Sequence, residues 1–221
     1  MDIAPLLEEG LNRLNISWTD EDIRNLEAYC RELFLWNPRY KLVRASQQEF
    51  VTGHIFDALA ALPVLNQLCG NGPLRSADVG SGNGIPGIPL ALMQKNSSMT
   101  LIERSAKRSG FLRNAVVASG LHNRVEVFEG DVRDLQDLFD LITFRAVSDL
   151  GGILPLLLPL AAPGGIIAAY KGRDESVSRE LDSLDVPMKV TLHDLHPPFL
   201  PEHRRQLVVL HIPCSLGDEG I

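Results

Sequence analysis

Two acidic residues and a run of glycines between them are the part of this sequence best suited to hold a ligand. From Asp78 the chain reads D-x-G-x-G-x-G, with glycines at positions 80, 82 and 84. Glycine lacks a Cβ atom, so the backbone there can turn tightly and approach a ligand closely. Glu103 ends the next apolar run, roughly 20 residues beyond Gly80, where an acid can accept both hydroxyls of a ribose. The spacing therefore predicts a nucleoside-binding site.

Two classes of cofactor fit a loop of this kind. The pattern G-x-G-x-x-G is matched by Gly82, Gly84 and Gly87, which would indicate a dinucleotide and an NAD-dependent oxidoreductase. A dinucleotide fingerprint should begin directly after a strand, however, and Gly80 occupies that place. The additional acid at Asp78 favours S-adenosylmethionine, whose positively charged end needs neighbours other than a pyrophosphate cradle. We therefore expect S-adenosylmethionine and disfavour the dinucleotide.

The elements that must position these residues alternate between strand and helix from Leu74 onward, which predicts a parallel sheet. Helices are expected from about Pro86, from 105 to 120 with Ser105 as the cap, and over 148–162 and 175–184. No helix separates the last two strands, so we expect them to form an antiparallel hairpin. The seven expected strands are 75–79, 99–103, 124–128, 139–144, 166–170, 189–195 and 206–212. This is the plan of an α/β, Rossmann-like class I methyltransferase with a mostly parallel sheet.

The carboxyl ends of parallel strands form the ligand-binding edge of such a sheet. Residues that follow the third and fourth expected strands are therefore expected beside the cofactor: Asp131, Val132, Arg133 and Arg145.

The N-terminal third of the chain shows helical periodicity instead. Apolar residues recur at helical spacing over 3–16, after Thr19 and after Ser46. Thr19 with Asp22 and Ser46 with Glu49 are capping boxes. We expect the loop 36–42 to break the second helix and Pro63 to end the third. The chain is thus expected to have an N-terminal helical extension, residues 1–70, packed on a methyltransferase domain, residues 71–221.

The charge of the chain is unevenly distributed. A net charge of −7 argues against a general affinity for nucleic acid, and residues 1–36 hold eight acids against three arginines. Cations gather in four short groups, which would form a local anion-binding patch if they converged on one face. Singly, each group also fits a solvated helix or loop. The groups are Arg39, Lys41 and Arg44; Arg104, Lys107, Arg108 and Arg113; Lys171 and Arg173; and His203, Arg204 and Arg205.

Cysteine usage and the N-terminus indicate a cytoplasmic protein. The three cysteines are far apart and form no C-x-x-C pattern, so we expect neither disulfides nor a metal site. The first residues lack the basic start and apolar core of a signal peptide. Residues 150–170 carry no charge, but three prolines and the glycine pair at 164 and 165 interrupt this run. A buried helix, a tight turn and a central strand explain this run better than a membrane span.

The sequence resembles the RsmG/GidB family, and the resemblance covers nearly the whole chain. It is carried by Trp36-Asn37 with Tyr40, His54-Ile55 with Asp57, the stretch from Asp78 to Ala91 with its G-x-P-G-I-P continuation, Lys107-Arg108 with Phe111-Leu112, Arg145-Ala146, Lys171-Gly172, and Arg205 before Leu207-Val208-Val209. Two positions depart from the family pattern, in which Asn usually stands where this chain has Lys41 and Arg where it has Gly53.

The resemblance implies methyl transfer from S-adenosylmethionine to N7 of a guanine in small-subunit (16S) ribosomal RNA. It implies cofactor contacts at Gly80, Ile85, Glu103, Val132, Arg133 and Arg145. The glycine-rich stretch adds Asp78 and Gly82, and the loop after the third expected strand adds Asp131. Guanine N7 has a free lone pair, so its attack on a methyl group needs alignment rather than a general base. His54, Arg145 and Lys171 are the candidate catalytic residues; His54 also fits an inter-helix hydrogen bond.

The expected RNA-binding residues are Lys41, Lys107, Arg108 and Arg205. The expected partner is small-subunit ribosomal RNA or a partly assembled small subunit, with no membrane, no metal and a monomeric chain. Two alternatives stay open: a class I methyltransferase acting on another RNA, a protein or a small molecule, and a ribosome assembly factor without catalysis.

Overall fold

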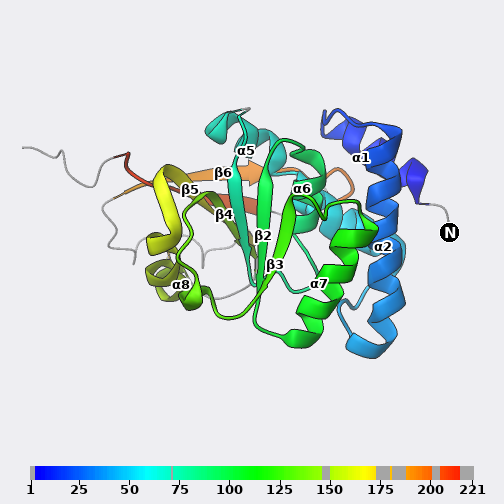
Figure 1. Ribbon diagram of the computed structural model, residues 1–221. Coiled ribbons are helices and arrows are strands. Elements are labelled where there is room, and N and C mark those ends of the chain that lie inside the picture. Colours follow the sequence, from blue (N-terminus) through cyan, green and yellow to red (C-terminus); the bar gives the residue numbers. More distant parts are fainter. Residues whose placement is uncertain are drawn as a thin grey trace, which may run out of the picture.

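A single sheet forms the centre of the computed structural model, which describes residues 3–70, 72–145, 150–172, 180, 188–200 and 205–214 (Figure 1). Within these residues the sheet has seven strands in the order β3-β2-β1-β4-β5-β7-β6. The strands are β1 (Arg75–Val79), β2 (Ser98–Glu103), β3 (Val125–Glu129), β4 (Phe139–Arg145), β5 (Ala161–Gly172), β6 (Lys189–Leu195) and β7 (Arg205–His211).

The direction of the strands agrees with the sequence pattern. β1 pairs in parallel with β2 and β4, β2 with β3, and β4 with β5. β7 is antiparallel to both β5 and β6, which confirms the predicted C-terminal hairpin. The predicted helix 175–184 lies outside the described residues except for Glu180, and so do Ala146, Arg173, His203 and Arg204.

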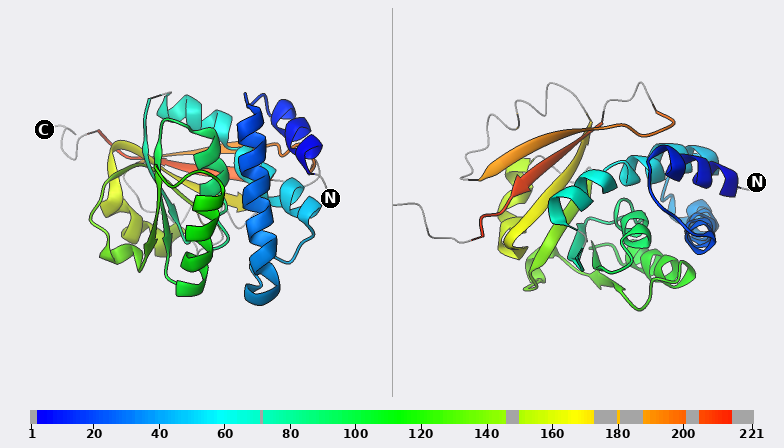
Figure 2. Two further views of the ribbon diagram at one scale, coloured as in Figure 1. Left: turned by 45° about the vertical axis from the view of Figure 1, so that its right-hand side comes forward. Right: turned by 90° about the horizontal axis from the view of Figure 1, so that it is seen from above.

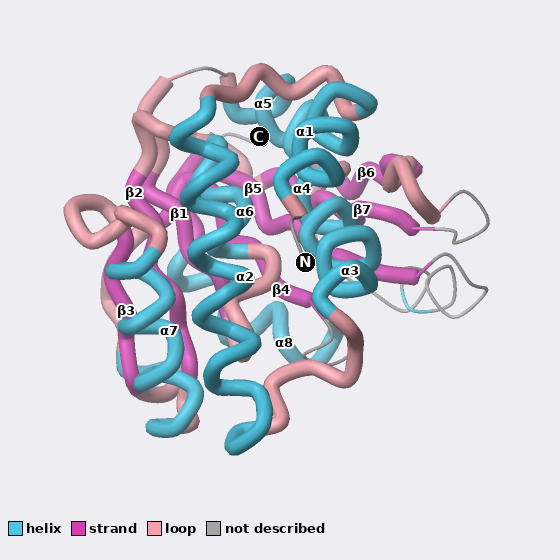
Figure 3. Tube along the Cα trace, turned by 90° about the vertical axis from the view of Figure 1, so that its right-hand side faces the viewer, coloured by secondary structure: helices cyan, strands magenta, loops and turns pink. Residues whose placement is uncertain are grey.

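Helices cover both faces of the sheet. α6 (Gly87–Met93) and α7 (Ala106–Ala118) lie on one face together with the helices of the N-terminal segment, and α8 (Leu150–Leu157) covers the other (Figures 2 and 3). Alternate residues of a strand pack into opposite layers: Ala168 faces the N-terminal helices, whereas Ile167 and Ala169 face α8. Because both faces of β5 are covered, its sequence is continuously apolar.

The uncharged run 150–170 forms a helix and a strand, as predicted. α8 is followed by a 3₁₀ helix (Leu158–Leu160), and β5 then begins at Ala161, five residues earlier than expected. The predicted turn lies within this strand as an irregularity: Gly164 has a φ of 77°, and the pairing of β4 with β5 shifts between Phe139 and Leu141. Among the described residues, no helix is long and apolar enough to cross a membrane.

The N-terminal segment contains α1 (Ala4–Arg13), α2 (Asp20–Tyr40), α3 (Gln47–Phe50), a π-helical segment (Val51–Ile55), α4 (Phe56–Leu59) and α5 (Leu62–Cys69). Both predicted capping boxes are present, at Thr19 and at Ser46. The buried apolar residues of these helices belong to the same cluster as those of α6 and as Met99 and Leu101 of β2. The predicted division of the chain at residue 70 stays a prediction.

Two predicted helix ends in this segment are wrong. α2 does not break at residue 36 but continues to Tyr40 with Pro38 inside its last turn. Trp36 stacks on Tyr40 at 4.9 Å and packs edge-on against Phe111 of α7, and these contacts hold the last turn despite the proline. Pro63 does not end a helix but lies in the first turn of α5, where its missing N–H is not needed.

Candidate active site

The glycine-rich loop leaves β1 and folds over the end of β2. Gly80, Gly82 and Gly84 have φ values of 72°, 55° and 90°, a region that side chains with a Cβ rarely enter. The N–H groups of Gly80 and Ser81 both donate to the carbonyl of Ile102, at 2.9 and 3.0 Å. The loop therefore requires glycine at these positions to close against β2.

Asp78 lies beneath this loop rather than beside the ligand. Its side chain accepts hydrogen bonds from the Gly87 N–H at 3.2 Å and the Thr143 hydroxyl at 3.0 Å, and the residue is 1% exposed. Burial raises the pKa of this carboxyl to about 6. Asp78 thus joins β1, β4 and the start of α6. The predicted contact of Asp78 with the cofactor stays a prediction, and this placement does not favour it.

Gly87 allows α6 to pack closely on the sheet. A Cβ atom there would lie 2.4 Å from Cδ2 of Leu101 and 2.8 Å from Oδ2 of Asp78. We expect Gly87→Ala to destabilise the fold by about 1–3 kcal/mol through overpacking and to lower the melting temperature by roughly 3–10 °C. Thermal unfolding followed by circular dichroism measures this.

The matched control is Gly53→Ala, because a Cβ at Gly53 meets nothing within 4 Å. That variant should melt no lower than the wild type. Equal melting temperatures for the two variants would show that Gly87 is not needed for close packing.

Glu103 ends β2 with a carboxylate that the backbone holds on both sides. One oxygen accepts from the N–H of Gly82 at 2.9 Å and the other from the N–H of Ser105 at 2.8 Å. A carboxylate has about four acceptor sites, so each oxygen keeps capacity for a ligand hydroxyl. Ser105 precedes α7 as predicted, but its side chain makes no capping hydrogen bond.

A cavity of about 540 Å³ opens at the carboxyl ends of β1, β2 and β4 and the loop after β3. Six predicted cofactor residues line it: Gly80, Glu103, Asp131, Val132, Arg133 and Arg145. The other three do not. Asp78 lies under the loop, Gly82 acts through its bond to Glu103, and Ile85 is 6% exposed within the core. These three cofactor contacts stay predictions.

Sequence reasoning missed part of the cavity wall. Gly152, Ile153 and Leu156 of α8 form one side, and Arg104 forms another. The available signal was the apolar run from residue 150, which indicated burial but not that one helix face borders a cavity. Leu156 is 37% exposed, unusual for a large apolar side chain in this chain.

Asp131 at the rim of this cavity is held by its neighbours. Its carboxylate caps the 3₁₀ helix Val132–Asp134 through the N–H of Arg133 and pairs with the Arg133 guanidinium at 2.8 Å. Hydrogen bonds from Arg133 therefore hold the pKa of Asp131 well below its usual range. Arg104 approaches the same carboxylate at 3.6 Å.

A second cavity, of about 230 Å³, adjoins the first and shares one residue with it, Arg145. Its other lining residues are Asp57, Tyr170, Lys171, Gly172, Leu195, Arg205 and Gln206. The Lys171 ammonium lies 3.0 Å from both carboxylate oxygens of Glu180. The three predicted catalytic residues therefore come together here, since Lys171 and Arg145 line the cavity and Arg145 bonds His54.

Arg145 is the centre of a polar cluster. One of its terminal nitrogens donates to Oδ2 of Asp57 at 3.0 Å, and the other lies 2.8 Å from Nδ1 of His54. Nε of Arg205 donates to the remaining oxygen of Asp57, also at 3.0 Å. Since Arg145 has only donors, Nδ1 of His54 must accept, which places the proton of the neutral imidazole on Nε2.

His54 is expected to stay neutral throughout the physiological range. Burial and then the charges of Arg145 and Arg205 lower the pKa of His54 to about 4. Folding disfavours its protonation, so this residue's contribution to stability is lost as the pH falls from about 6.5 towards 4. An NMR titration of the His54 ring should show a midpoint well below 6.5, with His54→Gln assigning the signal. A midpoint near 6.5 would contradict the cluster.

The four predicted RNA-binding residues are not gathered in one place. Arg205 lines the second cavity, and Arg108 lines the first, with its guanidinium 3.9 Å from Glu103. Lys41 and Lys107 are exposed, just beyond α2 and at the start of α7. Lys41 has a φ of 52°, a left-handed conformation that Asn adopts more readily. This conformation gives a physical reason for the Asn that the family pattern has there.

Comparison with known proteins gives relatives along most of the chain. The profile of the GidB family, described as rRNA small subunit methyltransferase G, matches residues 22–208. The ribosomal RNA small subunit methyltransferase G of Treponema pallidum is 37% identical over 218 residues, which cover 95% of each chain. That of Polynucleobacter asymbioticus is 30% identical over 92% of this chain and 94% of its own.

Solved structures show the same fold. A cofactor-bound protein from MTB superposes with a TM-score of 0.61 at 17% identity, over 86% of this chain and 90% of its own. A proposed S-adenosyl-L-methionine-dependent methyltransferase from Methanococcus maripaludis superposes with a TM-score of 0.58 at 15% identity, over 93% of this chain and 98% of its own. These likenesses confirm the predicted class I methyltransferase fold. The family profile and the relatives show that this chain belongs to the GidB family, rRNA small subunit methyltransferase G.

Proposed function

We propose that this protein transfers the methyl group of S-adenosylmethionine to N7 of a guanine in small-subunit ribosomal RNA. The observation that carries the proposal is that two adjoining cavities share Arg145 as a wall. One cavity has the acid and the glycine loop of a nucleoside site, and the other is lined by cations. Such a pair can hold a nucleoside donor and an anionic acceptor next to each other.

The larger cavity fits S-adenosylmethionine through the chemistry of its lining. Glu103, oriented by two backbone N–H groups, would accept the ribose hydroxyls. Apolar side chains of Ile102, Ile153 and Leu156 suit an adenine ring, and the Arg145 guanidinium suits the carboxylate at the amino-acid end. When bound, S-adenosylmethionine supplies an electrophilic methyl group on its sulfonium.

The smaller cavity suits a nucleotide whose N7 must stay free. Arg145, Lys171 and Arg205 offer donors for O6 or for a phosphate. His54 does not act as a base, because Nδ1 already accepts from Arg145 and N7 carries no proton. The residues of this cavity therefore align the guanine and exclude water, which is the help that this reaction needs.

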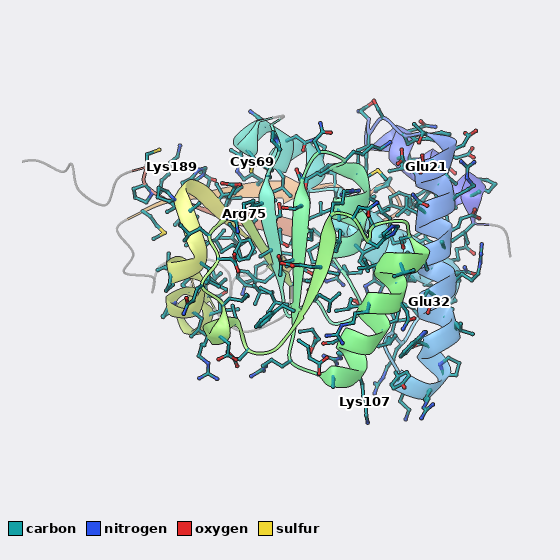
Figure 4. The ribbon with its side chains drawn as sticks, in the orientation of Figure 1. Glu21, Glu32, Cys69, Arg75, Lys107 and Lys189 are labelled. Atoms are coloured by element: carbon teal, nitrogen blue, oxygen red, sulfur yellow. The ribbon has the colours of Figure 1, made fainter. Side chains whose placement is uncertain are left out.

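Charge along α2 and α7 gives the RNA a direction of approach. The first turn of α2 carries Asp20, Glu21 and Asp22, whereas cations lie at its other end and at the start of α7, beside the cavities. Figure 4 shows Glu21 and Lys107 at opposite ends of the molecule. An RNA strand would therefore approach the carboxyl edge of the sheet and be repelled from the opposite edge.

Reversing the charge of Lys41 and Lys107 together should weaken RNA binding and flatten its salt dependence. Each lost phosphate contact reduces the slope by about 0.7 for single-stranded RNA, so we expect a reduction of about 1 to 1.5. Arg108 is left intact, because it borders the donor cavity. S-adenosylmethionine affinity should not change. Filter binding over a range of salt concentrations measures the slope.

The matched control reverses two exposed cations elsewhere, Arg24 near the start of α2 and Lys189 at the start of β6. This double variant has the same net charge as the Lys41 and Lys107 double variant, but its RNA binding should keep the salt dependence of the wild type. If the salt dependence of RNA binding becomes flatter by the same amount in both double variants, the effect comes from net charge and not from the surface around Lys41 and Lys107.

The proposed reaction is tested with labelled S-adenosylmethionine and small ribosomal subunits from a strain that lacks this protein. Label should enter the small-subunit RNA at one position, which borohydride and aniline then cleave, as expected for 7-methylguanine. Partly folded subunits should be better acceptors than naked RNA, because the body of the protein is acidic. Large-subunit RNA and transfer RNA serve as negative controls. Label on N1, N2 or a ribose oxygen would refute methylation at N7. Label on protein alone would refute RNA as the substrate.

A further inference from the structure

We propose that Asp57 is a positioning residue, which holds the guanidinium groups of Arg145 and Arg205 in place on either side of the acceptor cavity. The role rests on the proposed function, since it concerns the same cavity. Asp57 lies in α4, and its side chain is 5% exposed. Its two oxygens each accept one arginine at 3.0 Å, Oδ2 from Arg145 and Oδ1 from Arg205.

The two arginines come from strands that are not neighbours. Arg145 ends β4 and is paired with Tyr170 of β5, and Arg205 begins β7 and is paired with Gly172 of β5. β5 thus separates them, so their backbones lie two strand spacings apart, about 10 Å. Two guanidinium groups that converge on one cavity repel each other, and the carboxylate of Asp57 provides the opposite charge between them.

Asp57 does not itself have the geometry of a guanine reader. A carboxylate can accept from the N1–H edge of guanine only with an oxygen that faces the base. Both oxygens of Asp57 already receive guanidinium N–H groups, and the side chain is almost fully covered. Its effect on the acceptor therefore passes through Arg145 and Arg205.

His54 completes the restraint on Arg145. It lies three residues before Asp57, in the π-helical segment that runs directly into α4, so both side chains are on the same helix face. The two residues take the two terminal nitrogens of Arg145 separately. The planar guanidinium is thereby fixed in orientation as well as position, at the wall that both cavities share.

The test compares Asp57→Asn with Asp57→Glu. Asparagine removes the charge at nearly constant size, and glutamate keeps the charge but displaces the carboxylate by one methylene. If Asp57 positions the arginines, glutamate should restore the melting temperature that asparagine lowers, yet leave kcat reduced about ten- to 100-fold with little change in the KM for RNA. If Asp57 only balances charge, glutamate should restore kcat to the wild-type value, and that result would overturn the proposal.

Asp22→Asn is the matched control. Asp22 is 4% exposed and paired with Lys95 at 2.8 Å, but it lies near the start of α2, away from both cavities. This variant should lower the melting temperature and leave kcat unchanged. If Asp57→Asn does not fold, Asp57→Glu alone decides between the two roles.

A readout without catalysis separates this proposal from the proposed function. The Nε–H of Arg205 donates to Asp57, so its NMR signal should be protected from exchange with water in the wild type and lose that protection in Asp57→Glu. A wild-type protein that shows this protection but methylates no RNA refutes the function and leaves the positioning role intact. An Arg205 signal that exchanges equally fast in both proteins refutes the positioning role.

Discussion

Arg145→Ala should lower the rate of methyl transfer by at least about 10²-fold, the cost expected when reacting groups are misplaced by about 1 Å. Arg145 is the residue that both cavities share, and it contacts His54 and Asp57 through different nitrogens. The truncation removes the side chain that borders both proposed binding cavities. It also leaves Nδ1 of His54 without the guanidinium that donates a hydrogen bond to it. Single-turnover transfer from labelled S-adenosylmethionine to small subunits measures the loss, at a temperature where the variant is folded.

Arg75→Ala is the control for this variant. Arg75 begins β1 at the opposite edge of the sheet and pairs with Asp137 at 3.0 Å (labelled in Figure 4). Its replacement removes an arginine and an ion pair but touches neither of the two cavities. The Arg75 variant should transfer methyl groups at the wild-type rate. An Arg145 variant that does the same would exclude the shared wall as the basis of the reaction.

Glu103→Ala should weaken S-adenosylmethionine binding roughly ten- to 100-fold while RNA affinity changes little. Hydrogen bonds to a charged acceptor contribute about 1.5–3 kcal/mol each, and the same carboxylate orients the Gly82 and Ser105 N–H groups. The variant thus loses both the ribose acceptor and the support of the loop. Isothermal titration calorimetry measures the affinity.

Glu126→Ala serves as its control, because Glu126 lies on the neighbouring strand β3 and accepts from the Thr100 hydroxyl, without bordering the donor cavity. Its S-adenosylmethionine affinity should match that of the wild type. Unchanged affinity in Glu103→Ala would refute the assignment of this cavity to the nucleoside.

Local patterns in the sequence predicted the strands and helix starts well. The strands agree with prediction to within one residue except β5, because apolar runs bounded by turn residues are governed by nearby sequence. The capping boxes at Thr19 and Ser46 form because each needs only residues three apart. The end of α2 at Tyr40, beyond Pro38, was not predictable in this way, since contacts with α7 decide it.

The polar cluster at the second cavity depends on residues that the sequence keeps far apart. Asp57 contacts Arg145 across 88 positions and Arg205 across 148. No local pattern encodes such a meeting. The strand order placed Arg145 at the ligand-binding edge, but Asp57 was named only through family resemblance. The predicted cofactor contact of Asp78 stays a prediction: an acid at a strand end can turn under a loop or towards a ligand, and only packing decides between them.

The Glu103 carboxylate binds the N–H groups of Gly82 and Ser105, so one side chain ties the glycine loop to the start of α7. These hydrogen bonds lie within the protein, so the loop becomes ordered as the chain folds. Glycine residues are the ones that lose most freedom on becoming ordered. In this chain that loss is a cost of folding, and the two hydrogen bonds to Glu103 help to offset it.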